Sequence, residues 1–191
     1  MKVLCKLVCS LFLLFQAGLS YASDSLNLML LPDPYGCHQV GVEMGINANS
    51  TLGVLGRGSC ESDRPTYGAM NEDVENTFSR ILVPFRYSFS GVFKDGYFVQ
   101  GLAGLEKSEF KSSLGSTSNV TFASFAAHGG YQWFWKNGFN ISLMGGVAYL
   151  QNIETSESIV GGEDSDVVKF LDKNTKANIH GGGGVFMGWL F

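Results

Sequence analysis

The chain has 191 residues and a formal net charge of −4 at pH 7, and only 16% of its residues are charged. A chain of this length fits one domain. Its negative charge gives no support to nucleic-acid binding, which requires a basic face, so we expect no nucleic-acid partner. The charged fraction lies below the roughly 25% of a typical soluble domain. The chain has 25 glycines, a high number, and its 15 phenylalanines make it too aromatic for a disordered protein.

The first segment, residues 1–22, reads MKVLCKLVCSLFLLFQAGLSYA. It has a basic start, an apolar run over 7–15, and small residues at 20 and 22. This order predicts a cleaved secretory signal peptide over 1–22, followed by a mature domain over 23–191. The apolar run is too short for a membrane-spanning helix.

After the signal, the sequence alternates apolar and polar residues in a way that favours strands over helices. In 77–89, for example, Ile81, Phe85 and Tyr87 fall on one face, and Arg80 and Arg86 fall on the other. Eight strands are expected, at 26–32, 37–46, 51–60, 77–89, 96–108, 120–135, 138–150 and 180–191. Most are close to the roughly 9–11 residues with which a tilted strand crosses a bilayer.

The expected connections differ in length at the two ends of the strands. At one end they are tight, over 47–50, 91–96 and 136–138, and at the other end they are long and polar, over 61–76, 109–119 and 153–176. Short turns on one side and long loops on the other are typical of outer-membrane barrels.

Side-chain volume indicates which face points outward, because an eight-stranded barrel has a narrow interior. Small residues such as Gly130 and Gly146 lie on the polar faces, and bulky aromatic residues lie on the opposite faces. We therefore predict an all-β fold, an eight-stranded antiparallel up-and-down transmembrane β-barrel; the alternative is a soluble barrel with the pattern inverted. The residues expected at the membrane interface are Tyr131, Trp133, Trp135, Trp189 and Phe191.

Two segments carry a family resemblance. The ending VFMGWLF at 185–191 resembles the C-terminal signal by which bacterial outer-membrane proteins are recognised for assembly, and 129–150 resembles a hairpin of small OmpA/OmpX/OmpW-like barrels. The resemblance implies a protein of the Gram-negative cell outer membrane. Its implied partners are the barrel-assembly machinery during insertion, outer-membrane lipids and lipopolysaccharide.

Cys37 and Cys60 remain after signal cleavage, and an even pair in an exported protein predicts a disulfide. A tight turn with Asn47 opposite Ser50 places the two cysteines directly opposite each other on neighbouring strands. The same register mixes the polar and apolar faces of these strands, so it requires a β-bulge.

The polar faces also define a candidate site in the lumen. Its predicted polar network comprises Glu43, Arg80, Arg86, Gln100, Glu106, Ser124, His128 and His180. Ser124 and His128 share a face but lie roughly 13 Å apart along a strand, too far for a nucleophile and its base. No catalytic residue, cofactor or metal site is therefore expected.

The expected function is a structural or surface-interaction role, exerted through the long outer loops toward an extracellular partner, with the lumen plugged by side chains. Two alternatives stay open: a lipid-modifying enzyme that resembles the lipid A deacylases, and a narrow porin-like channel for small hydrophobic solutes.

Overall fold

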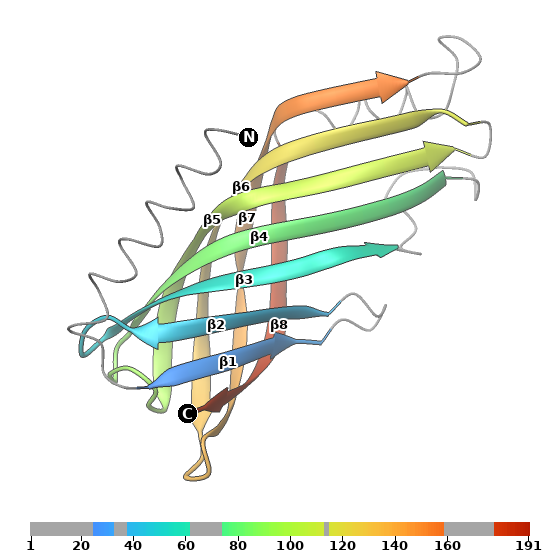
Figure 1. Cartoon of the computed structure of the whole chain (residues 1–191). Coiled ribbons are helices and arrows are strands. Elements are labelled where there is room, and N and C mark those ends of the chain that lie inside the picture. The colour runs from blue at the N-terminus through green and yellow to red at the C-terminus, as the bar shows by residue number, and fades with distance from the viewer. Residues whose placement is uncertain (1–24, 33–37, 62–73, 113–114, 159–177) are drawn as a thin grey trace.

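The computed structural model describes residues 25–32, 38–61, 74–112, 115–158 and 178–191 (Figure 1). In this part of the chain, eight antiparallel strands close into one barrel, and β1 pairs with β8. This confirms the all-β, eight-stranded antiparallel fold. The strands are β1 (Leu26–Leu31), β2 (Gln39–Gly45), β3 (Ser50–Glu61), β4 (Val74–Ser88), β5 (Gly96–Ser112), β6 (Thr117–Phe134), β7 (Phe139–Ser158) and β8 (Asn178–Leu190).

The strands are much longer on one side of the barrel than on the other. β1 and β2 have 6 and 7 residues, whereas β6 and β7 have 18 and 20. We call the end with connections 46–49, 89–95 and 135–138 the turn end, and the opposite end the loop end. The predicted loops at 109–119 and 153–176 were too long, because β5 continues to Ser112, β6 begins at Thr117 and β7 continues to Ser158. The predicted signal peptide lies outside the described residues.

The expected alternation of faces is present, with the polar side inward. On β5 the outward Tyr97 is 69% exposed, whereas the inward Gln100 is 4% exposed. On β4 the outward Phe85 is 48% exposed and the inward Arg86 is 2% exposed. The barrel therefore buries polar groups and exposes apolar ones, the reverse of an ordinary soluble protein.

The register between β2 and β3 differs by one residue from the predicted one. Glu43 pairs with Gly53, not with Val54. The turn is wider than expected: the Ile46 amide donates to the Ser50 carbonyl at 2.9 Å, and the Asn47 side chain accepts from the Ser50 amide at 2.8 Å. In this register the described pairs between β2 and β3 run without a bulge and do not mix the faces.

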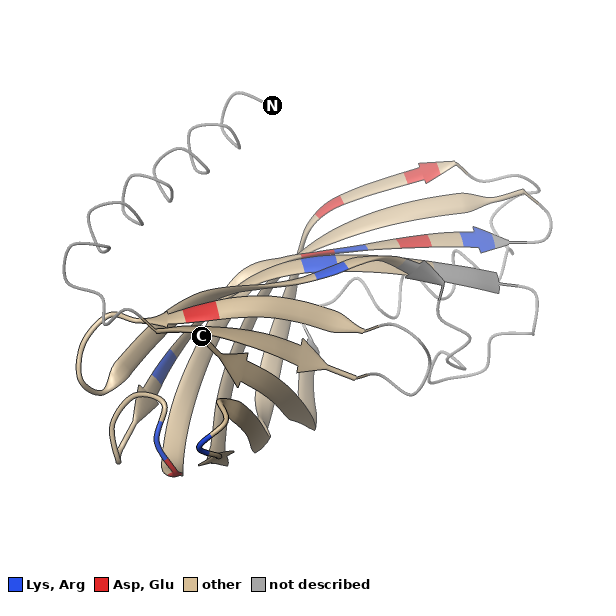
Figure 2. Ribbon diagram, turned by 60° about the horizontal axis from the view of Figure 1, so that its bottom comes forward, with Lys and Arg blue, Asp and Glu red and all other residues tan. Residues whose placement is uncertain are grey.

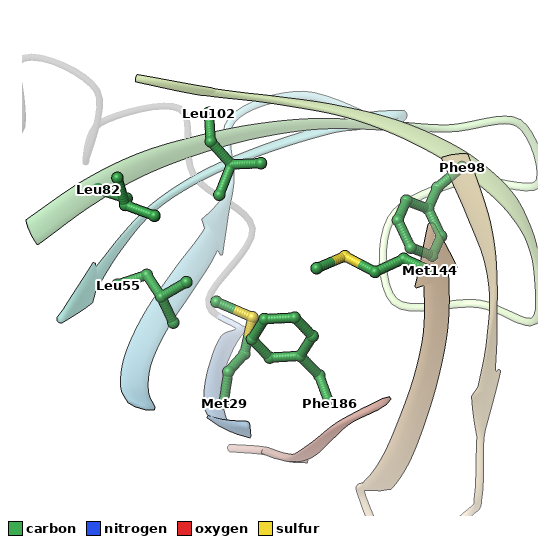
Figure 3. Close-up of a cluster of buried hydrophobic side chains, with 7 residues drawn as sticks. All are labelled: Met29, Leu55, Leu82, Phe98, Leu102, Met144 and Phe186. Atoms are coloured by element: carbon green, nitrogen blue, oxygen red, sulfur yellow. The ribbon is translucent and has the colours of Figure 1, made fainter. Parts of the chain in front are cut away.

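An apolar cluster fills the middle of the barrel (Figure 3), and it comprises Met29, Leu55, Leu82, Phe98, Leu102, Met144 and Phe186. Inward glycines provide space for these side chains. A Cβ atom added at Gly130 would lie 2.7 Å from the ring of Phe98, and one added at Gly104 would lie 2.9 Å from Leu82 Cδ2. Large and small residues thus interdigitate in a narrow interior.

The barrel closes through a short seam between β1 and β8. Its register runs from Asn27 opposite Leu190 to Leu30 opposite Met187. Leu26 and Phe191 extend it, since each backbone amide donates to the other residue's carbonyl, at 3.2 and 2.9 Å. The seam is the shortest pairing in the described barrel, where β7 and β8 pair over Phe139–Leu150.

Candidate functional site in the barrel lumen

The inner face of the barrel changes from polar to apolar and back to polar between the turn end and the loop end. Three pairs across β3 and β4 mark these layers: Thr51 opposite Arg86, Leu55 opposite Leu82, and Arg57 opposite Arg80. The apolar cluster thus lies between two polar groups. We call them the turn-end network and the loop-end cluster.

The turn-end network is built around a buried ion pair. Arg86 Nη1 lies 3.3 Å from Glu43 Oε1, and their side chains are 3% and 1% exposed. Glu43 also accepts hydrogen bonds from Asn27 Nδ2 at 2.9 Å and from Thr51 Oγ1 at 3.1 Å. The carboxylate is therefore neutralised and hydrogen-bonded on both oxygens, as a buried charge requires.

The guanidinium of Arg86 is held equally closely. It donates to Gln100 Oε1 at 3.2 and 3.3 Å and to Gln132 Oε1 at 3.0 Å, and it stacks 4.4 Å from the ring centroid of Phe98. Asn140 extends the network by donating to Asn27 at 2.7 Å. Side chains from β1 to β7 thus join one network, which closes the lumen at the turn end.

The loop-end cluster is more loosely paired. Arg80 donates a hydrogen bond to Gln39, and its Nη1 lies 3.9 Å from Glu106 Oε1, with side chains 23% and 13% exposed. Arg57 lies over the ring of Phe78 at 4.6 Å. The distance in this second ion pair is longer than in the first, and its side chains are more exposed to solvent, so it contributes less to stability.

Ser124, His128 and His180 do not join the turn-end network. Ser124 is 3% exposed, and His180 is exposed at the loop end of β8. In the described chain, His128 Nδ1 is buried with no hydrogen-bond partner. No carboxylate among the described residues therefore hydrogen-bonds this nitrogen, as the orienting acid of a serine–histidine–acid relay would.

The predicted interface aromatics all lie on the outer wall at the turn end. Tyr131 packs against Tyr97 at 4.9 Å and against Trp133 at 4.8 Å between ring centroids. The same end carries a second group, in which Phe139 contacts two tryptophans, Trp135 at 5.3 Å and Trp189 at 5.9 Å. Phe191 is 71% exposed.

The cysteine pair falls outside what the structure describes, since Cys37 and the side chain of Cys60 are not among the described positions. The described pairs between β2 and β3 end at Val40 opposite Gly56, and the pairing of β3 with β4 shifts register between Arg57 and Cys60. The disulfide therefore stays a prediction.

Several lumen residues were missing from the predicted network. Asn27, Thr51, Gln132 and Asn140 belong to the turn-end network, and the apolar cluster was not predicted. The alternation did indicate that Gln132 and Asn140 lie on polar faces of their segments. It did not indicate which polar residues contact one another, because the contacts depend on strand register and barrel closure.

No helix among the described residues is long and apolar enough to cross a membrane. In the same residues, no group of three or more histidine, cysteine, aspartate or glutamate side chains is placed to hold a metal ion. Comparisons with protein-family models, with curated proteins and with solved structures found no match.

Proposed function

We propose that this chain is a bacterial outer-membrane β-barrel protein of the OmpA/OmpX/OmpW-like kind, with a closed lumen and a structural or surface-interaction role at its loop end. The observation that carries the proposal is the reversed polarity of the barrel. A buried network of charged and amide side chains lies inside, and a continuous apolar surface lies outside. Water does not stabilise such an outer surface, whereas hydrocarbon does.

The apolar outer surface forms a band of bilayer dimensions. On β4 it runs from Ile81 to the following Phe89, and on β5 from Tyr97 to Leu105. Its edges are in register, because Ile81 pairs with Leu105 and the Phe89 amide donates to the Tyr97 carbonyl. The band is about nine residues tall along each strand, close to the roughly 9–11 residues of a tilted membrane strand.

The charged residues follow the same division (Figure 2). Along the ribbon they fall largely at the turn tips and toward the loop end. Glu43 and Arg86 are buried in the lumen, and the outward positions of the band carry no charge in the described chain. Just beyond the band, Ser79 pairs with Lys107. A soluble, lipocalin-like barrel would place its charges on the outer wall and its apolar residues in the lumen.

The filled interior favours a structural or surface-interaction role over a channel. The apolar cluster fills the middle of the lumen, and the turn-end network crosses it between seven strands. An interior filled in this way supports a plugged lumen over the water-filled path of larger barrels. The loop end, where β4 to β7 project beyond β1 and β2 (Figure 1), offers the surface for an extracellular partner.

The proposal is tested by electrophoretic mobility of the full chain in outer-membrane fractions of a Gram-negative host, heated against unheated. A heat-modifiable band in this fraction is expected, because a closed barrel resists unfolding by detergent until it is heated. Running the gel with and without reductant tests the predicted disulfide separately. A soluble periplasmic band without a heat shift would refute the membrane assignment and favour an inward-facing ligand-binding barrel.

A further inference from the structure

The outer wall of the barrel carries a shallow, open hollow. A hollow of about 420 Å³ lies over β4 to β7, within the apolar band. This volume falls within the roughly 300–1,000 Å³ of small-molecule sites. It is lined by outward residues of β4 to β7, among them Phe85, Tyr87 and Val99, and also by the inward Gln100, His128 and Gly146.

The floor of the hollow consists of small residues brought together by register. Gly101 pairs with Ala127, and Gly129 pairs with Gly145. Phe85 and Tyr87 on β4 and Val147 on β7 stand at its sides. Four small outward positions on three neighbouring strands thus form one depression between large side chains.

Interior packing does not require these outward glycines. A Cβ atom at Gly101 would have no described atom within 4 Å, and one at Gly129 would lie 3.9 Å from its nearest neighbour. At the inward Gly130, by contrast, a Cβ atom would lie 2.3 Å from a backbone oxygen. Because glycine weakens a strand, the outward glycines cost stability without relieving a clash. Their effect is to keep the hollow open.

We propose that this hollow binds one acyl chain of a membrane phospholipid, an inference that rests on the proposed membrane location. Gly129 lies four residues from Trp133, or about 13 Å along the strand, so the hollow is at hydrocarbon depth if the tryptophan lies at the interface. The surface that the lining exposes is almost wholly apolar, although Tyr87, Gln100 and His128 contribute to it. It therefore suits a hydrocarbon chain from the turn-end leaflet better than a polar headgroup.

A second copy of the chain is a poorer fit to this surface. A two-fold dimer presents the same patch from both subunits, so the patch must complement itself. Two hollows facing each other would leave a void, and voids at packed interfaces lose van der Waals contacts. A flexible acyl chain, in contrast, adapts to the floor and to the aromatic rim.

The test is photolabelling of the full chain in vesicles of phosphatidylethanolamine and phosphatidylglycerol. The vesicles carry a small fraction of phosphatidylcholine with a photoactivatable group in one acyl chain, and labelled peptides are mapped by mass spectrometry. We expect labelling concentrated at 99–101, 127–129 and 145–147. The double variant Gly101→Leu/Gly129→Leu fills the hollow, so labelling there should fall several-fold.

Gly58→Leu is the matched control, because Gly58 is exposed and a Cβ atom there meets no described atom within 4 Å, yet it lies outside the hollow. It should label like the wild type. Even labelling around the barrel, or unchanged labelling in the double variant, would overturn the inference. Crosslinked dimers lost in the double variant would overturn it in favour of a second copy. A heat-shift gel on the same vesicles separates these outcomes from failure of the barrel to insert, which would refute the proposed function itself.

Discussion

The ion pair between Glu43 and Arg86 should be the most sensitive point of the barrel interior. Replacing Glu43 by leucine removes the carboxylate that lies 3.3 Å from Arg86 Nη1. It leaves a guanidinium only 3% exposed, with two glutamine carbonyls and an aromatic ring as its remaining partners. Asn27 and Thr51 also lose their acceptor.

The expected loss in the free energy of unfolding follows from these contacts. Breaking a buried ion pair by removing one partner costs about 3–5 kcal/mol, mainly because the other charge stays buried. The double variant Glu43→Leu/Arg86→Met removes the stranded charge as well. It leaves unpaired glutamine and asparagine groups, each of which costs about 1–3 kcal/mol. The loss in the free energy of unfolding should therefore be much smaller in the double variant than the sum of the losses in the two single variants.

The assay is equilibrium unfolding in urea of barrels refolded into lipid vesicles, followed by the heat-shift gel and arranged as a double-mutant cycle. Glu106→Leu is the control, because its ion pair with Arg80 is longer, at 3.9 Å, and partly exposed. That substitution should cost no more than about 1 kcal/mol. A Glu43→Leu cost no larger than the Glu106→Leu cost, or strictly additive single effects, would refute the reasoning.

Three further predictions follow from the two faces of the wall. Gly130→Ala should destabilise the barrel by about 1–3 kcal/mol through overpacking against the Leu143 carbonyl and the Phe98 ring. Gly101→Ala should be close to neutral, and equal urea midpoints for the two variants would contradict this. Val147→Arg, in the middle of the apolar band, should lower the free energy of unfolding by about 2–4 kcal/mol, and Ile153→Arg, beyond the band, should lower it by only about 0–1 kcal/mol. Equal losses in urea unfolding would argue against a membrane-embedded band. The three tryptophans, Trp133, Trp135 and Trp189, all lie at the turn end. Their fluorescence should therefore be quenched more by lipids brominated near the headgroup than by lipids brominated near the end of the acyl chain. The reverse order would contradict an interfacial position.

The alternation of side chains was enough to predict the barrel and its two faces. On β4 the sequence placed Phe85 and Arg86 on opposite faces, and the structure exposes the first and buries the second. This succeeds because a strand has a side-chain period of two whatever its partners are. Strand ends were harder to predict, since polar residues such as Glu109 and Lys111 continue β5 beyond the apolar band.

Contacts between strands depend on information that alternation does not carry. The pairing of Glu43 with Arg86 depends on the register across β2, β3 and β4, and a turn one residue wider than assumed shifts that register. The apolar cluster was missed for a related reason. Leu82 and Phe98 lie on otherwise polar faces, and only barrel closure shows that they belong to one cluster.

The seam between β1 and β8 has a consequence for how the barrel forms. Every other pairing joins strands that follow each other in the chain, whereas Leu28 meets Trp189 only when the eighth strand has arrived. Until then the growing sheet has two open edges, and in the proposed membrane location their backbone groups would find no partner in hydrocarbon. The interior network has the same requirement, because it draws on β1 and on β7. We therefore expect that a chain truncated before β8 forms no smaller stable version of this fold.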